Sequence, residues 1–175
     1  MKTLQSSYRR PDRNVIRRKN RQGFNLIEIT LTILIMGILF AVAAPVYSKS
    51  LFRFRAESAA QRIVQDIEHT KQLARQTNTT RMIVFSKDDS SYTVDGAISL
   101  DNSLQPYLVS LNQDPYRTSI HTLTTTADPS RPLSAITLAF DRFGMPDQGL
   151  SITVQSGDIQ KQVVVTAILG RVTVL

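Results

Sequence analysis

The sequence predicts an α+β fold, in which one long N-terminal helix with a transmembrane half and an amphipathic half packs on an antiparallel β domain. Three observations predict it. An apolar run covers residues 24–47 with a single charge. Apolar residues then recur at spacings of three and four as far as Ala74. From Arg81 onward, short β-like runs alternate with turn residues. We therefore expect four segments: a basic tail at 1–23, a transmembrane helix at 24–47, its amphipathic continuation at 48–80, and a β-rich domain at 81–175.

The positive charge of the chain is confined to the first segment. Residues 1–23 hold eight of the 21 Lys and Arg but only one of the 14 Asp and Glu, namely Asp12. The tail therefore carries the whole net charge of +7, and the remainder has 13 charges of each sign. A nucleic-acid-binding domain is expected to carry a basic patch of its own, so composition argues against nucleic acid as a partner.

The apolar segment is long enough to cross a bilayer. A helix rises about 1.5 Å per residue, so residues 24–47 span roughly 30 Å or more. The basic tail in front predicts a cytoplasmic N-terminus, with everything after the span outside. A cleaved secretory signal peptide, with Ala41–Ala44 as its small-residue site, and a plain membrane anchor are the alternatives. Glu28 argues against both, because a carboxylate inside a spanning helix is costly and usually has a partner and a function.

The helix is expected to continue from Asn25 to about Thr77, with a bend at Pro45. Asn78, Thr79 and Thr80 are weak helix formers that suit its end. The expected apolar face consists of Phe52, Ala56, Ala59, Ala60, Ile63, Ile67, Thr70 and Ala74. The positions left for the polar face are Arg53, Arg55, Glu57, Arg62, Gln65, Asp66 and Glu68.

The last segment is predicted to form an antiparallel β domain whose apolar face rests on the helix. The segment from Asp101 to Pro132 is rich in Ser, Thr, Asn, Asp and Pro and is expected to form loops with short strands. A Gly157-Asp158 pair between two runs is a common hairpin signal. The expected strands are Met82–Ser86, Ser91–Val94, Ser134–Phe140, Leu150–Gln155, Val163–Ile168 and Val172–Leu175.

The start of the helix resembles the type III signal of type IV pilins and pseudopilins. The resemblance rests on the basic tail, Gly23, Phe24 and Leu26-Ile27-Glu28 at the head of an apolar helix. Asn25 departs from it, since Thr or Ser is commoner there, and a leader of 23 residues is longer than in many major pilins. The resemblance implies that a prepilin peptidase removes residues 1–23 by cutting between Gly23 and Phe24. It also implies N-methylation of Phe24, a role for Glu28 in assembly, and a helix-bending proline at Pro45.

The charge on Glu28 has a physical rationale if the chain enters a filament. Cleavage creates a positive α-amino group on Phe24, which then enters an apolar bundle of helices. Glu28 of a neighbouring subunit can pair with that amine, and two paired charges avoid the desolvation cost of either one alone. We therefore expect Glu28 to set the register of the subunits.

The last part of the chain, roughly forty residues, resembles the GspH/FimT family of minor pseudopilins and minor pilins. The resemblance rests on Phe140-Asp141-Arg142-Phe143-Gly144, on Gly149-Leu150-Ser151-Ile152 and on Gly170-Arg171-Val172. We expect these glycines to be turn residues with positive φ. Asp114-Pro115-Tyr116 only faintly echoes the Asp-Pro-Trp-Gly loop of major pseudopilins and is interpreted as an ordinary turn.

No motif for catalysis, cofactor binding or metal binding is found, so we expect neither an enzyme nor a cofactor. The chain has no cysteine, which excludes disulfides, thiolate metal sites and thiol catalysis. Hydrolase elbow, phosphate loop and zinc-protease motifs are absent from the sequence. His69 and His121 are far apart and are expected on the surface. A calcium site, for which Asp88, Asp89, Asp95 and Asp101 are the candidates, stays open as a minor alternative.

The resemblances imply a minor pseudopilin of a type II secretion system, a structural subunit that supports protein export across the outer membrane. Its expected partners are the prepilin peptidase, other major and minor pseudopilins, and an inner-membrane assembly platform. Its expected location is the bacterial inner membrane as a single-pass protein with a periplasmic C-terminal domain, and then a periplasmic filament. The alternatives are a minor pilin of a type IV pilus, used in adhesion, motility or DNA uptake through Arg131, Arg142 and Arg171, and a membrane-anchored periplasmic enzyme.

Overall fold

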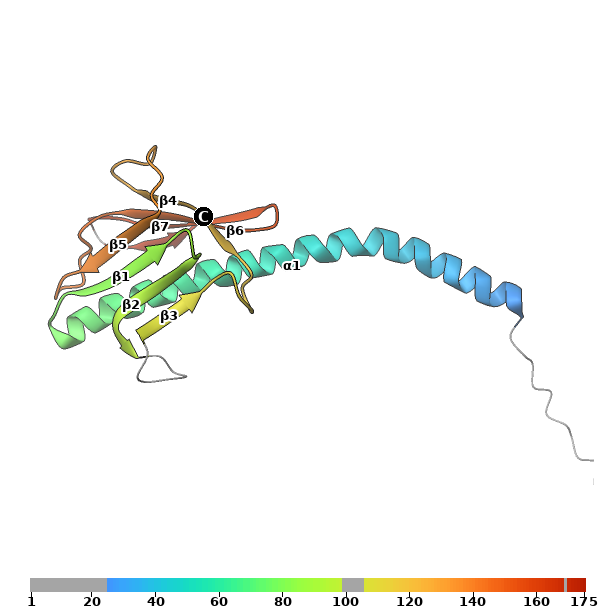
Figure 1. Ribbon diagram of the computed structural model, residues 1–175, viewed down its shortest axis with the longest axis horizontal. Helices are drawn as coiled ribbons and strands as arrows, with labels where there is room; N and C mark the ends of the chain where they lie inside the picture. Colours follow the sequence, from blue (N-terminus) through green and yellow to red (C-terminus); the bar gives the residue numbers. More distant parts are fainter. Residues whose placement is uncertain (1–24, 99–105, 169) are drawn as a thin grey trace, which may run out of the picture. The chain divides into compact units, whose positions relative to one another are not determined.

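The computed structural model describes residues 25–98, 106–168 and 170–175. It contains one helix and eight strands in the order α1-β1-β2-β3-β4-β5-β6-β7-β8 (Figure 1). Their bounds are α1 Leu26–Thr77, β1 Arg81–Ser86, β2 Ser91–Ile98, β3 Pro106–Ser110, β4 Ser119–Thr125, β5 Ala135–Phe140, β6 Leu150–Ser156, β7 Ile159–Val165 and β8 Val172–Val174.

Helix α1 confirms the long helix that the sequence predicts, almost to the residue. At its start, the Asn25 side chain lies 3.4 Å from the backbone N–H of Ile27, in the manner of an N-cap. At its end, Asn78 adopts a positive φ of 52°. The N–H of Thr79 then bonds back to the carbonyl of Ala74 at 3.2 Å, which is the six-residue closure typical of a helix C-terminus.

The β domain is built from two antiparallel four-stranded sheets. One has the strand order β3-β2-β1-β5 and the other β4-β6-β7-β8. In the first, Phe85 of β1 is opposite Tyr92 of β2 and Ile136 of β5. In the second, Ile152 of β6 is opposite Leu123 of β4 and Val163 of β7. This arrangement confirms the predicted fold class and adds a division into two sheets.

Several strand limits differ from the prediction for local reasons. Strand β2 continues to Ile98, because a register irregularity after Val94 and a positive φ at Gly96 carry the strand past Asp95. Strand β7 begins at Ile159, four residues before the predicted start, and its first part is mostly polar and only partly buried. The predicted loop-rich stretch contains β3 and the seven-residue β4.

One hydrophobic core joins the helix and both sheets. Helix α1 contributes a narrow stripe of small and branched side chains, and the strands contribute alternate residues. In β6, for example, Leu150, Ile152 and Val154 are buried while the residues between them are half-buried. The buried helix residues of the core are Ala59, Ala60, Ile63, Ile67 and Ala74.

In the part of the chain that the structure describes, two units are distinguished, one that ends at Ala41 and one that begins at Val42. All strands and the second half of α1 belong to the second unit, and Figure 1 shows the strands alongside this part of the helix. The sequence-based segment limits at residues 23, 47 and 80 remain predictions.

Candidate functional site

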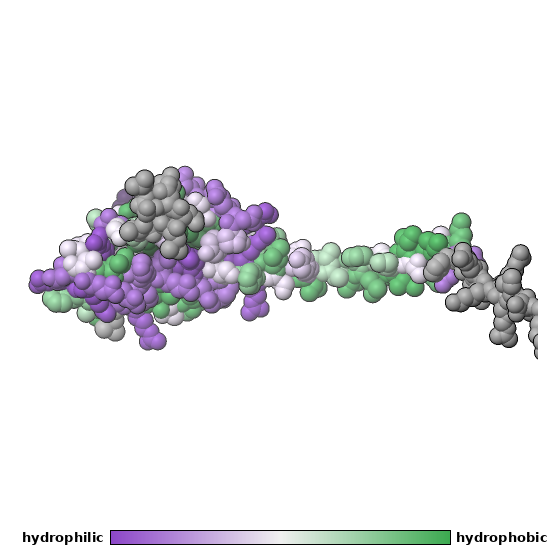
Figure 2. Space-filling view, turned by 90° about the horizontal axis from the view of Figure 1, so that it is seen from below, coloured by the Kyte–Doolittle hydropathy of each residue, from purple (hydrophilic) through white to green (hydrophobic). Residues whose placement is uncertain are grey.

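The first half of α1 presents a continuous apolar surface. Every side chain from Asn25 to Ser50 is exposed in the structure, and Figure 2 shows hydrophobic residues along this part of the helix. The helix is long and apolar enough to cross a membrane. An apolar surface of this size needs a covering partner, which can be lipid or other apolar helices. Its large hydrophobic members include Leu26, Ile27, Leu31, Ile33, Leu34, Met36, Ile38, Leu39, Phe40, Val42, Val46 and Tyr47.

Three hydroxyl side chains of this surface bond to the helix itself. The hydroxyl of Thr30 donates to the carbonyl of Ile27 at 2.9 Å, and that of Thr32 donates to the carbonyl of Ile29 at 2.8 Å. Ser48 donates to the carbonyl of Ala44 at 3.1 Å. These groups therefore need no water, which suits a helix in an apolar environment.

Glu28 lies in the first turn of α1 and is exposed. It stands third after the capping residue Asn25, where a negative charge is stabilised by the positive end of the helix dipole. Within residues 25–47 it is the only charged side chain. The surface thus combines a large apolar area with one carboxylate near its end.

The other predicted site residues are placed only in part. Gly23 and Phe24 lie outside the described residues. Pro45 lies inside α1, and the helix assignment continues through it. The predicted bend at Pro45 therefore remains a prediction, as do cleavage after Gly23 and methylation of Phe24.

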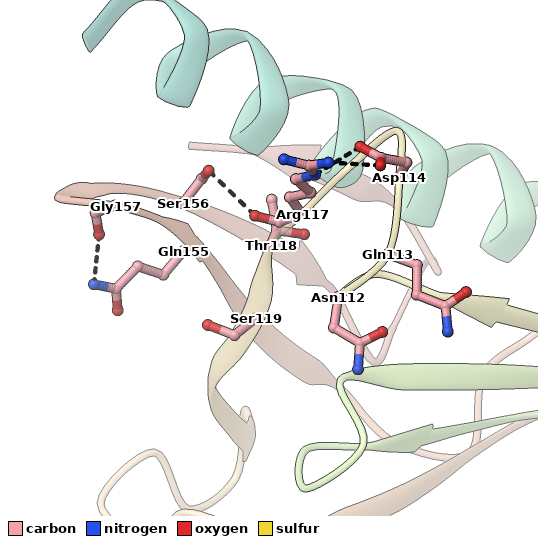
Figure 3. Close-up of a pocket in the computed structure, with 9 residues that line it drawn as sticks. All are labelled: Asn112, Gln113, Asp114, Arg117, Thr118, Ser119, Gln155, Ser156 and Gly157. Atoms are coloured by element: carbon pink, nitrogen blue, oxygen red, sulfur yellow. Dashed lines mark hydrogen bonds and ion pairs between the residues drawn. The ribbon is translucent and has the colours of Figure 1, made fainter. Parts of the chain in front are cut away.

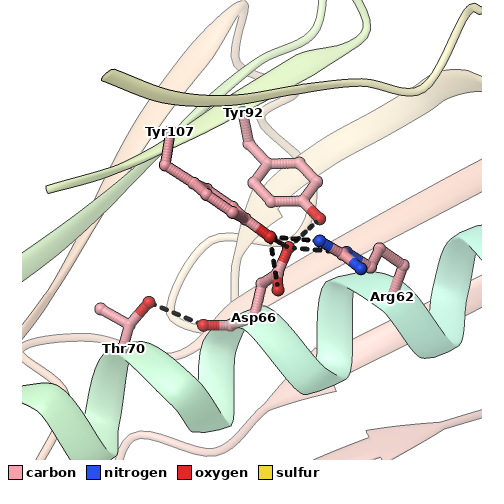
Figure 4. Close-up of polar contacts among 5 residues, drawn as sticks. All are labelled: Arg62, Asp66, Thr70, Tyr92 and Tyr107. Carbon is pink, nitrogen blue, oxygen red and sulfur yellow. Dashed lines mark hydrogen bonds and ion pairs between the residues drawn. The ribbon is translucent and has the colours of Figure 1, made fainter. Parts of the chain in front are cut away.

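A buried polar cluster in the second unit was not predicted (Figure 4). Its centre is Asp66, which was expected on the polar face of the helix but is only 7% exposed. The hydroxyl of Tyr92 donates to Asp66 Oδ2 at 2.5 Å, and that of Tyr107 donates to Asp66 at 3.0 Å. Arg62 Nε donates to Asp66 Oδ2 at 3.1 Å. Arg62 also donates through Nη2 to the hydroxyl of Tyr107.

The cluster links α1 to the strands β2 and β3. Burial and the neighbouring Asp66 carboxylate raise the pKa of Tyr92. The same two causes raise the pKa of Tyr107, against the opposing effect of Arg62. Burial by itself would lower the pKa of Arg62, but attraction to Asp66 and the bond to Tyr107 raise it overall. Both tyrosines therefore remain protonated donors to a single carboxylate.

The burial of Asp66 could have been predicted from the spacing of the apolar residues along the helix. Asp66 lies three residues after Ile63 and four before Thr70, and both of these are fully buried. Thr70 donates to the carbonyl of Asp66 at 2.7 Å. Asp66 was predicted on the polar face because it is charged. Its position in the periodic pattern, however, is part of the buried stripe.

The Phe140–Gly144 motif forms a tight turn against the end of α1. The Asp141 carboxylate accepts hydrogen bonds from the N–H groups of Phe143 and Met145, at 2.9 and 2.8 Å. Gly144 has a φ of 75°, and Arg75 of α1 donates to the carbonyl of Phe143 at 2.8 Å. The turn is thus held by a side chain, a glycine and a helix residue.

The glycines of the second resemblance do not all share one role. Gly144 and Gly170 have the expected positive φ, and Gly170 lies against Pro146 next to this turn. Gly149 does not have a positive φ, so that expectation was wrong for this residue. Gly149 instead leaves room for Thr126 and for the carbonyl of Val165, which a side chain at this point would contact.

An open polar groove of about 870 Å³ lies beside the start of β4 (Figure 3). The Asp114–Arg117 ion pair, with 2.7 Å between Arg117 Nε and Asp114 Oδ1, is part of its lining. The hydrogen bond from Arg117 lowers the pKa of Asp114. The predicted turn at Asp114–Tyr116 is confirmed. The remaining lining is uncharged: Asn112, Gln113, Thr118, Ser119, Gln155, Ser156 and Gly157.

Candidate metal ligands are not brought together in the part of the chain that the structure describes. Within it, no group of three His, Cys, Asp or Glu side chains is placed to hold a metal ion. His69 on α1 and His121 on β4 are both exposed, as expected. Of the calcium candidates, Asp89 accepts a hydrogen bond from Ser86 in the β1–β2 turn, and Asp101 lies outside the described residues.

Comparisons with known proteins give two similar structures. Both are crystal structures of the type IV minor pilin FimU from Pseudomonas aeruginosa strain PAO1. The first, in space group P21, has a TM-score of 0.48 and 13% sequence identity, over 70% of this chain and 90% of that chain. The second, in space group P65, has a TM-score of 0.45 and 12% identity, over 68% and 91%. No protein-family model matches the chain, and no curated protein matches it.

Proposed function

We propose that this chain is the precursor of a minor subunit of a pilin-like filament, and specifically of a type II secretion pseudopilus. The observation that carries the proposal is an apolar helix surface preceded by Gly23-Phe24 and marked by one carboxylate, Glu28. In a plain anchor such a carboxylate would have no role. In a helix that packs against other helices in a fixed register, it can pair with a charge on a neighbour.

The architecture supports the same proposal. A helix that continues from an apolar segment into a packed β domain can hold that domain at the outside of a helix bundle. In the proposed maturation, a prepilin peptidase removes residues 1–23 and Phe24 becomes a methylated N-terminus. Other pseudopilins and an inner-membrane assembly platform are the proposed partners. The role is structural, and the domain is periplasmic.

The proposal is tested by the mature N-terminus and by cross-linked neighbours. The sequence has no cysteine, so single cysteines at Ser50 or Gln72, both exposed, give defined cross-links. Thr70→Cys is the matched buried control, because Thr70 is fully buried and should not be trapped. Mass spectrometry of the trapped complexes identifies both the partners and the N-terminal residue.

We expect a methylated Phe24 at the N-terminus and pseudopilins among the partners. Pilins as partners would assign the subunit to a type IV pilus instead. An uncut leader together with an absence of filament partners would contradict the proposal as a whole.

A further inference from the structure

A second charged feature of the helix lies just beyond the apolar segment. Lys49, Arg53 and Arg55, which we call the basic collar, lie within seven residues of one another. No acidic residue occurs between Glu28 and Glu57. Because Lys49 and Arg53 are four residues apart on a helix, they share one face.

The two cations on this face are accessible to a partner. Lys49 and Arg53 are exposed, and neither forms an ion pair within residues 25–98, 106–168 and 170–175. The nearest acid along this face, Glu57, is held by Lys161 at 3.3 Å and by Gln61 at 3.1 Å. These two hydrogen bonds are the main causes that lower the pKa of Glu57, and Arg53 adds only a smaller attraction. Arg55 differs in being half-buried, and it attracts Asp114, whose pKa it helps to lower.

Two aromatic side chains accompany the collar without being covered by the domain. Tyr47 is 71% exposed and Phe54 is 70% exposed. Being seven residues apart, they also share one face of the helix. Tyrosine is enriched where a helix leaves a membrane, because its ring is apolar and its hydroxyl is polar. The segment therefore carries cations on one side and aromatic rings on another.

On the helix, Lys49 lies at the height of the lipid headgroups and Arg53 lies just above them. About 20 helical residues cross the hydrocarbon core, so a span that starts at Leu26 reaches its outer edge near Pro45. With a rise of about 1.5 Å per residue, Lys49 lies roughly 6 Å and Arg53 roughly 12 Å above that edge. Headgroups occupy about 5–8 Å on each side of a bilayer. Both flexible side chains can bend back to that layer.

Cations in this position oppose the orientation of the chain. Lys and Arg close to a span favour the cytoplasmic side, whereas the basic tail at 1–23 assigns the collar to the outer side. Lys49 and Arg53 on the outer side therefore need a function that offsets their unfavourable effect on orientation.

We propose that Lys49 and Arg53 bind the phosphate groups of anionic phospholipids in the outer leaflet, with Tyr47 at the membrane interface. The collar then holds the base of the periplasmic domain at the membrane surface until the subunit leaves the bilayer. This inference rests on the membrane-spanning part of the proposed function and is independent of the kind of filament. Phosphate is the acidic partner that the geometry favours, because it is present at this height all around an inserted helix.

The test uses the full chain in vesicles, with a single tryptophan as a local reporter. The sequence contains no Trp, so Tyr47→Trp places one fluorophore next to the collar. Lipids with brominated acyl chains quench it only on contact. Two vesicle preparations are compared: brominated phosphatidylglycerol in ordinary phosphatidylcholine, and brominated phosphatidylcholine in ordinary phosphatidylglycerol. The ratio of quenching in the two gives the preference for the anionic lipid next to position 47 on the helix. The basic leader is distant from this position and does not contribute.

We expect a preference of about fivefold for phosphatidylglycerol, lost in the Lys49→Gln/Arg53→Gln variant and reduced by about 0.5 M salt. Arg131→Gln/Arg171→Gln removes two exposed charges outside the collar and should keep the preference. Equal quenching by both lipids would overturn headgroup binding but not membrane insertion. So would a preference that survives in the Lys49→Gln/Arg53→Gln variant. Absence of quenching by either lipid would overturn membrane insertion of the helix as well.

Discussion

At the scale of single residues, Asp66 determines how the cluster of Arg62, Tyr92 and Tyr107 is assembled. A buried carboxylate is costly unless donors surround it, and here two hydroxyls and a guanidinium do so. The removal of one donor therefore costs more than one ordinary hydrogen bond, because it leaves a charge partly unpaired.

Tyr92→Phe should lower the free energy of unfolding by about 1.5–3 kcal/mol, because a fully buried hydroxyl that donates to a carboxylate is lost. Urea unfolding of the full chain in detergent, followed by circular dichroism, measures the change. Tyr116→Phe is the matched control, since it removes a hydroxyl from a half-buried tyrosine outside the cluster. Equal losses in the two variants would contradict a special role for the cluster.

The same hydroxyl predicts a dependence on alkaline pH. An unfolded tyrosine loses its proton near pH 10, whereas burial and Asp66 raise the pKa of Tyr92 in the folded state. Above pH 10 the unfolded state therefore binds fewer protons, and the free energy of unfolding falls as pH rises, by at most about 1.4 kcal/mol per unit from this group. The stability difference between wild type and Tyr92→Phe should thus narrow above pH 10. The stability difference should stay constant between pH 6 and 9. A narrowing in that range would contradict the attribution of the effect to the Tyr92 hydroxyl.

The proposed role of Glu28 is a contact between subunits. Glu28→Gln keeps the size of the side chain but removes the charge that should pair with a neighbour's Phe24 amine. We expect at least a tenfold loss from sheared filaments, because an unpaired ammonium in an apolar bundle costs several kcal/mol. Glu28→Asp, which keeps the charge, should retain part of the incorporation. The mass of the N-terminal peptide should show unchanged cleavage in both variants, and wild-type recovery of Glu28→Gln would exclude the pairing.

At the scale of elements, the turn after β5 depends on backbone conformation. A Cβ at Gly144 would lie 2.4 Å from Arg75 Nε, and the φ of 75° disfavours any L side chain. Gly144→Ala should therefore lower the free energy of unfolding by about 1–3 kcal/mol in the same urea experiment. Gly37→Ala adds the same methyl group where nothing lies within 4 Å and should leave the β domain unaffected.

The elements also show why sequence predicted some features and not others. The limits of α1 follow from a long periodic pattern and a clear end at Asn78, both of which are local. The pairing of β1 with β5 joins Arg81 to Phe140, so it depends on contacts that no local pattern encodes. Tyr107 was missed for the same reason, since it reaches Asp66 across 41 positions of sequence.

At the scale of the whole molecule, charge is divided between a basic tail and a neutral remainder. The tail must outweigh the collar if the β domain is to lie outside the cytoplasm. The substitution of Arg17, Arg18, Lys19 and Arg21 by Gln should therefore increase the fraction of inverted chains severalfold.

An impermeant thiol reagent applied to intact cells, with Gln160→Cys as the exposed target, measures this orientation. Lys49→Gln/Arg53→Gln is the matched control, and it should keep or strengthen the normal orientation. If the substituted tail left orientation unchanged, another feature of the chain would have to set it.

The links from Asp66 to Tyr92 and Tyr107 also have a mechanical consequence. They connect the helix to two neighbouring strands of one sheet at a single level of α1. A pull along the helix axis would load these bonds together, in shear, and not one after another as in a peeling hairpin. Bonds loaded in parallel share the force, so the sheet should yield only when the bonds fail together.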